Sequence, residues 1–116
     1  MEGLNLEVLQ KKEKELSDLY QKLKIERERL LEELKKLKEK EDKVYEKLSS
    51  TRDYMLYARL EVLLSNISEK RKQEEEKLKE LEKKIRGLER ELETIRKRIE
   101  FLKPKGEWKV VYETSQ

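Results

Sequence analysis

The chain has 116 residues, of which 49% are charged and 34% hydrophobic, and its formal net charge is +3. Too few apolar side chains are present to fill a conventional globular core, while the near balance of charges, the single Pro and the three Gly argue against disorder. A composition dominated by Glu, Lys, Leu and Arg with helical periodicity is typical of a coiled coil, which is the class we expect.

The sequence contains no Cys and no His. This excludes disulfides and thiolate metal sites and removes the commonest general base and metal ligand. No apolar run approaches the roughly 18 residues of a membrane span, and the N-terminal stretch MEGLNLEVLQ lacks the basic start and apolar centre of a signal peptide. We therefore expect a cytoplasmic protein without a metal or cofactor.

The N-terminal half predicts a long helix over residues 4–48. One apolar seam recurs every seven residues, and a companion seam, three residues earlier in each heptad, mixes apolar with charged side chains. The first seam consists of Leu9, Leu16, Leu23, Leu30, Leu37 and Val44, and the companion seam of Leu6, Glu13, Tyr20, Arg27, Leu34, Glu41 and Leu48. A repeat of seven over this length implies a left-handed supercoil with a partner helix.

Residues 49–53, SSTRD, predict a turn between two helices. Ser, Thr and Asp are residue types whose side-chain oxygens cap the start of a helix. The flanking helices would be about 68 and 74 Å long at roughly 1.5 Å per residue, and this match in length favours a break here. No Gly or Pro marks the turn, so one continuous helix stays the alternative.

The C-terminal half predicts a second coiled-coil helix over residues 54–102. Its seam alternates spacings of three and four, and twelve of its fourteen positions are apolar. The seam consists of Tyr57, Leu60, Leu64, Ile67, Arg71, Glu74, Leu78, Leu81, Ile85, Leu88, Leu92, Ile95, Ile99 and Leu102. Together the two halves predict an all-α fold, an antiparallel two-helix coiled-coil hairpin over residues 1–103.

The charged positions of the first helix's companion seam suggest how the two helices face each other. In an antiparallel hairpin the residue numbers of facing positions have a nearly constant sum, and oppositely charged residues satisfy this rule for a turn centred near Ser50. The predicted buried polar pairs are Arg27 with Glu74, Glu41 with Arg59, and Glu13 with Arg86. A half-buried charge is costly without a partner, which supports this register.

Residues 104–116 predict a short, irregular, non-helical tail that begins at Pro104, because Pro ends a helix. Trp108 and Tyr112 lie in a segment with strand propensity, yet the chain offers no second strand. The aromatic side chains either fold back on the helices or belong to a peptide that binds a partner's sheet edge or groove.

Directly after the turn, charge thins out and apolar residues crowd together. Met55, Leu56 and Leu63 lie beside the seam of the second helix, and Val62 lies away from it. Two helices cannot cover all of these side chains, so we expect apolar area to remain exposed near the turn. The alternatives are a partner or dimer surface and a core that widens near the turn.

No catalytic constellation is present in the sequence. It has no Gly-rich phosphate loop, no zinc-ligand spacing and no His or Cys to act as base or nucleophile, so we do not expect an enzyme. The basic stretches EKRKQ and IRKRIE are diluted by nearby Glu, so we do not expect nucleic-acid binding.

The hairpin with Tyr and apolar residues after its turn resembles the FliJ family of flagellar type III export and its YscO-like relatives. The resemblance is carried by LEVLQKKEKELSDLYQKL, YMLYARLEVLLSNISEKRKQ and IRGLERELETIRKRIEFL. It implies a non-enzymatic stalk that engages a hexameric export ATPase, the export gate and escort chaperones, and that sits peripherally at the membrane export apparatus. The helix ends distant from the turn, residues 4–16 and 92–108, would then meet the ATPase ring.

Two other classes of protein share this architecture. One is a structural coiled-coil scaffold that forms a homodimer through its apolar patch. The other is a prefoldin-like holdase chaperone, although prefoldin subunits carry β-hairpins between their helices and SSTRD leaves no room for one.

Overall fold

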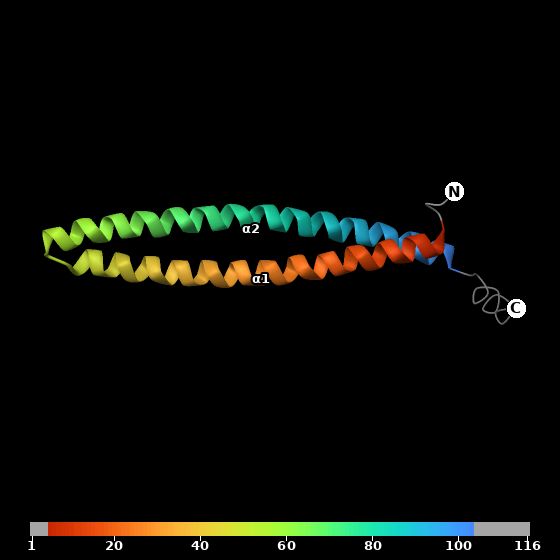
Figure 1. Ribbon diagram of the computed structural model, residues 1–116, viewed down its shortest axis with the longest axis horizontal. Helices are drawn as coiled ribbons and strands as arrows, with labels where there is room; N and C mark the ends of the chain where they lie inside the picture. The colour runs from red at the N-terminus through yellow and green to blue at the C-terminus, as the bar shows by residue number, and fades with distance from the viewer. Residues whose placement is uncertain (1–4, 104–116) are drawn as a thin grey trace, which may run out of the picture. The chain divides into compact units, whose positions relative to one another are not determined.

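The computed structural model describes residues 5–103, which form two long α-helices (Figure 1). Helix α1 spans Leu6–Ser50, helix α2 spans Tyr54–Leu102, and residues 51–53 join them. The predicted fold class, an all-α antiparallel two-helix coiled-coil hairpin, is confirmed. Helix α2 has the predicted bounds, whereas α1 begins and ends two residues later than predicted. The predicted tail from Pro104 onward, with Trp108 and Tyr112, lies outside the described residues.

The turn is shorter than predicted because its two serines belong to α1. Within the last turn of that helix, the hydroxyl of Ser49 donates to the carbonyl of Tyr45 at 2.9 Å and the hydroxyl of Ser50 donates to the carbonyl of Lys47 at 3.3 Å. Serine hydroxyls commonly make this bond to a carbonyl three or four residues earlier. These residues therefore complete a helix instead of starting one.

The start of α2 is capped by Asp53. One carboxylate oxygen, Oδ1, accepts hydrogen bonds from the backbone N–H groups of Met55 at 3.0 Å and Leu56 at 3.2 Å. The hydroxyl of Thr51 accepts a further bond from the backbone N–H of Asp53 at 3.2 Å. These bonds satisfy N–H groups that have no partner inside the helix, and so they stop α1 and start α2 within three residues.

The chain divides into two compact parts. The turn part is Lys22–Ile85, and the end part is formed by the described residues up to Gln21 on α1 and from Arg86 on α2. In the end part, Leu9 of α1 packs with Ile95 and Ile99 of α2. Leu92 is the most deeply buried side chain there, at 2% exposure. This part has the uninterrupted apolar seam that the heptad pattern of α2 predicts.

The turn part has a more polar seam. Its buried apolar side chains are Leu30, Leu37, Val44, Leu60, Leu81 and Ile85. Between them the seam also contains Glu74, which is only 8% exposed, and the half-buried Arg27, Glu41 and Arg71. Tyr57, predicted for the seam, is 41% exposed. Helical side chains lean toward their own N-terminus, so a residue in the first turn of α2 points beyond the last residue of α1.

The predicted partners of the charged seam residues are wrong. The ion pairs are Arg27 with Glu82 at 3.6 Å, Glu41 with Arg71 at 2.8 Å, and Glu13 with Arg96 at 3.9 Å. Glu74 instead pairs with Lys77 of its own helix at 3.2 Å, and Arg59 is exposed.

Each observed partner lies eight to twelve residues further along α2 than predicted, for two reasons. The turn is centred on Arg52 and not near Ser50, which moves all facing positions along α2. In addition, the side chains of both helices lean toward lower residue numbers. In an antiparallel pair, the tip of an α1 side chain therefore meets the tip of a side chain attached further along α2.

Candidate functional site

Four apolar side chains of α2 remain exposed near the turn, and they are the four predicted as a partner surface. Met55 is 68% exposed, Leu56 44%, Val62 62% and Leu63 46%. We call these four residues the tip patch. The structure therefore places none of them in the core, and the alternative that they widen the core near the turn is wrong.

The heptad repeat gathers the tip patch on one side of α2. Met55 and Val62 are seven residues apart, as are Leu56 and Leu63, so each pair occupies equivalent positions two turns apart. Met55 therefore lies away from the seam together with Val62, and its predicted place beside the seam is wrong. Lys70 continues the line of Leu56 and Leu63 by a further seven residues. The patch is therefore a stripe about two turns long that gives way to charged side chains away from the turn.

A row of lysines on α1 starts beside the end of this stripe and runs on away from the turn. Lys36, Lys40, Lys43 and Lys47 follow one another at spacings of four, three and four, which aligns them along one helix face. Lys36 and Lys40 line the same surface hollow as Lys70 of α2. One heptad nearer the turn, the repeat places Lys47 beside Leu63 in the same way that Lys40 lies beside Lys70. We call these four residues the lysine row.

The lysine row forms no ion pairs within the hairpin's described residues. All four side chains are exposed, and none forms an ion pair with another residue in the range 5–103. Arg59, which lies on α2 between the two turns of the tip patch, is likewise exposed and without an ion pair in that range. The tip patch thus has basic side chains beside it on both helices.

Three tyrosines add exposed aromatic surface near the turn that our sequence-based site did not include. Tyr54 is 88% exposed, and Tyr45 and Tyr57 are also exposed. Tyr54 is the first residue of α2, and Tyr45 directly follows the buried Val44. The signal available in the sequence was the proximity of all three residues to the predicted turn.

The most extensively hydrogen-bonded polar cluster of the turn part is centred on Glu41. Oε2 of Glu41 accepts hydrogen bonds from Nε of Arg71 at 2.8 Å and from the hydroxyl of Ser68 at 2.9 Å, and Nη1 of Arg71 also binds Glu75 at 2.6 Å. The bond from Arg71 holds the pKa of Glu41 below its usual range, although partial burial acts in the opposite direction.

The same hydrogen bond to Glu41, followed by that to Glu75, raises the pKa of Arg71. Both members of the pair therefore stay charged near neutral pH. Because the bonding partners of this cluster come from both helices, it joins α1 to α2 in this register. Arg27 is less well satisfied, since its Nε is buried without a hydrogen-bond partner.

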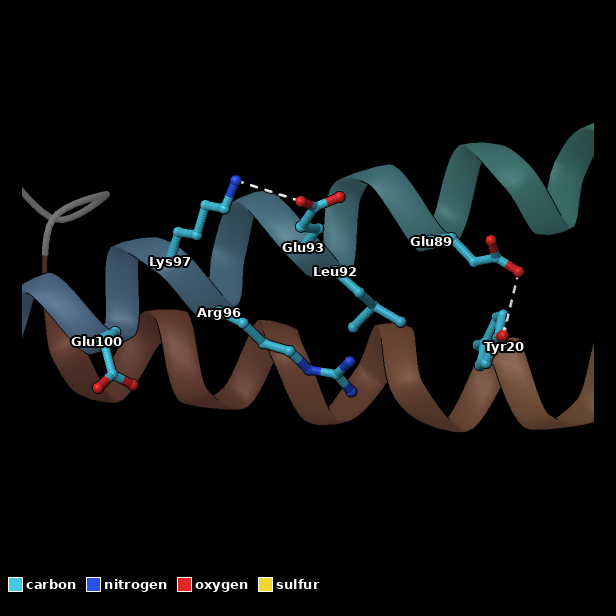
Figure 2. A pocket seen from close by; sticks show the side chains of 7 residues that line it. All are labelled: Tyr20, Glu89, Leu92, Glu93, Arg96, Lys97 and Glu100. Carbon is cyan, nitrogen blue, oxygen red and sulfur yellow. Dashed lines mark hydrogen bonds and ion pairs between the residues drawn. The ribbon is translucent and has the colours of Figure 1, made fainter.

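The end part contains a second hollow, of about 440 Å³, at the surface of the helix pair (Figure 2). Its lining residues are Tyr20, Glu89, Leu92, Glu93, Arg96, Lys97 and Glu100. The hydroxyl of Tyr20 donates to Glu89 at 3.1 Å, and Lys97 pairs with Glu93 at 3.2 Å (Figure 2). Arg96 pairs with Glu13 at 3.9 Å. These contacts join charged surface groups around one apolar side chain, Leu92.

Residues 5–103 contain no group of three or more His, Cys, Asp or Glu side chains arranged to hold a metal ion. Within the same range, neither helix is long and apolar enough to cross a membrane. The tip patch with its basic border is the candidate functional site. No family model, curated protein or solved structure matches this chain.

Proposed function

We propose that the protein is a non-enzymatic coiled-coil adaptor or stalk that binds other proteins. The observation that carries this proposal is the tip patch, whose four apolar side chains lie outside the helix seam and stay exposed. Apolar side chains gathered on one surface and bordered by charge are typical of protein-interaction sites.

The more specific proposal rests on the resemblance to the FliJ family. In this proposal the protein is a component of flagellar or related type III export, located in the cytoplasm at the membrane export apparatus. The helix ends, residues 4–16 and 92–108, meet the export ATPase ring, and the tip patch is available to the export gate or to escort chaperones. The antiparallel hairpin supports the proposal, because such a stalk needs two paired helices with distinct ends.

The rate of ATP hydrolysis by a purified export ATPase tests this function. We expect the full-length protein to raise the rate, and we expect replacement of the exposed Val8 by Glu to reduce the stimulation by adding a charge at the helix end. Leu31→Glu is the matched control, since Leu31 is similarly exposed but lies in the turn part. No stimulation by the wild-type chain, or equal loss in both variants, would contradict the proposal.

A structural scaffold that dimerises through the tip patch is the second candidate, and the same exposed side chains favour it. Light-scattering mass separates the two, because a scaffold of this kind is a dimer that dissociates when Met55 and Val62 are replaced by Ser. A holdase chaperone is less well supported, since the three-residue turn contains no β-hairpin. Suppression of client aggregation without stimulation of the ATPase would favour it.

A further inference from the structure

We infer that the occupant of the tip patch is an acidic amphipathic helix of a partner protein, docked against the tip patch and the lysine row together. The inference rests on the proposed adaptor function and adds the chemistry of the partner. It is carried by the shape of the apolar stripe, the sign of its border and the absence of acidic partners for that border within residues 5–103.

The spacing of the tip patch matches a helix. Met55 and Val62 form one line and Leu56 and Leu63 form another, each repeating after seven residues. These two lines present ridges and a groove to an incoming helix whose apolar residues recur at the first and fourth positions of a heptad. The line of Leu56 and Leu63 lies on the side of α2 that faces the lysine row, so the incoming helix would contact both helices of the hairpin.

The charge of the border selects the partner. Arg59 on α2 and Lys47 on α1 lie beside the stripe, and Lys43, Lys40, Lys36 and Lys70 follow beyond its end, away from the turn. Glu33 and Glu74 share the hollow at the far end of the row. Glu74 is already paired with Lys77. Glu33 offsets part of the charge away from the turn, and the exposed Glu39 and Glu46, three or four residues from Lys36 and Lys43, offset part of it along the row. Glu or Asp side chains flanking the apolar positions of a docked helix would meet the remaining cations. Such complementarity increases the association rate and excludes basic partners.

A second copy of this chain fits the surface less well. In a two-fold symmetric contact the same patch lies on both subunits, so a second copy would bring the same basic border and no acidic surface to meet it. A lipid surface also fits less well, because interfacial helices carry an apolar face along most of their length. The stripe here ends at Leu63 and continues as the charged Glu69 and Lys70.

The probe for the test is a designed amphipathic helix of about three heptads, with Leu at the first and fourth positions and Glu at the flanking positions. A second peptide has Lys in place of every Glu. Fluorescence anisotropy of the labelled peptides measures binding to the full-length protein. We expect the acidic peptide to bind at least about tenfold more tightly than the basic one, with the preference shrinking in about 1 M salt.

Two variants separate the apolar and the charged contributions. Met55→Ser with Val62→Ser should weaken binding of the acidic peptide at least about tenfold, while far-ultraviolet circular dichroism stays that of the wild type because both side chains are exposed. Lys40→Glu with Lys47→Glu should reverse the preference between the two peptides. Lys14→Glu with Lys35→Glu is the matched control: it changes the net charge equally, on exposed positions outside the lysine row, and should leave the preference intact.

Three results would overturn the inference. The first is equal binding, or no binding, of the two peptides by the wild-type chain. The second is binding to vesicles of phosphatidylglycerol and phosphatidylcholine in place of the acidic peptide. The third is a dimer whose mass halves in the Met55 and Val62 variant. If the protein stimulates the export ATPase but binds both peptides equally, the acidic-helix inference is wrong and the proposed stalk function stands. If it prefers the acidic peptide but does not stimulate the ATPase, the proposed stalk function is wrong and the acidic-helix inference stands.

Discussion

The end part and the turn part use the same heptad repeat in opposite ways. In the end part apolar side chains fill most of the seam, with Leu9, Leu92 and Ile95 almost fully buried and Glu13 half-buried. In the turn part charged residues occupy several seam positions, while the apolar side chains of the tip patch lie outside the seam. Apolar content alone therefore does not locate the core, because the position of a side chain in the repeat decides whether it is buried or exposed to a partner.

The largest expected effect is in the apolar seam of the end part. Replacing Leu92 by Ala should lower the free energy of unfolding by about 2–5 kcal/mol, because it removes a buried side chain and leaves a cavity. Val62→Ala in the exposed tip patch is the control and should change it by less than about 0.5 kcal/mol. Urea unfolding followed by circular dichroism measures both, and similar losses would mean that the tip patch is part of the core.

The polar seam of the turn part should respond differently to single and double replacements. Arg71→Leu leaves Glu41 without its main partner, and we expect a loss of about 1.5–3 kcal/mol, the range for a hydrogen bond to a charged group. Adding Glu41→Leu should restore most of this stability, since an apolar pair needs no compensating charge. Chemical denaturation compares the free energies of unfolding of the variants. A double variant that is less stable than Arg71→Leu would show that the ion pair stabilises the fold by more than the cost of burying its two charges.

The pH dependence should also distinguish the two parts. Because folding lowers the pKa of Glu41, its contribution is fully present above the unfolded-state pKa of about 4.3 and is lost as pH falls through the lower folded-state pKa. The difference in unfolding free energy between wild type and Glu41→Gln should be constant from about pH 6 to 8 and shrink below about pH 4. A difference that grows on acidification would reverse the sign of this effect.

The cap at the turn should contribute less. Asp53→Ala removes the oxygen that accepts two backbone hydrogen bonds and should cost about 1 kcal/mol. Asp53→Asn keeps an oxygen at this position and is the matched control, expected to be almost neutral. Thermal unfolding compares the two variants, and an equally large loss in Asp53→Asn would point to the charge of Asp53 and not to its hydrogen bonds.

The smallest expected effect is a gain in the end part. Gly87 lies inside α2, and a methyl group added there would have no heavy atom within 4 Å. Gly87→Ala should therefore raise the free energy of unfolding by about 0.5–1 kcal/mol, since Ala favours the helix over the unfolded chain. A loss in thermal stability would indicate that this position contacts something beyond the hairpin.

Much of the fold followed from the sequence because the apolar period is long and regular. The seam of α2 is buried or half-buried at every predicted position except Tyr57, and α2 has the predicted bounds. The exposure of the tip patch was also predictable, since its residues lie outside that seam. The exposure of Tyr57 could not be predicted, because the position where α1 ends determines whether a residue in the first turn of α2 has a side chain to pack against.

The buried seam of each helix could be predicted from the sequence, because a heptad repeat specifies which face of a helix is buried. The hairpin was favoured over one continuous helix but not decided. The ion-pair partners depend on how the two helices pack. Glu41 binds Arg71 and Arg27 binds Glu82, in a chain where opposite charges are available at almost every turn. The position of the turn and the lean of long side chains select among those charges, and both depend on how the two helices are packed.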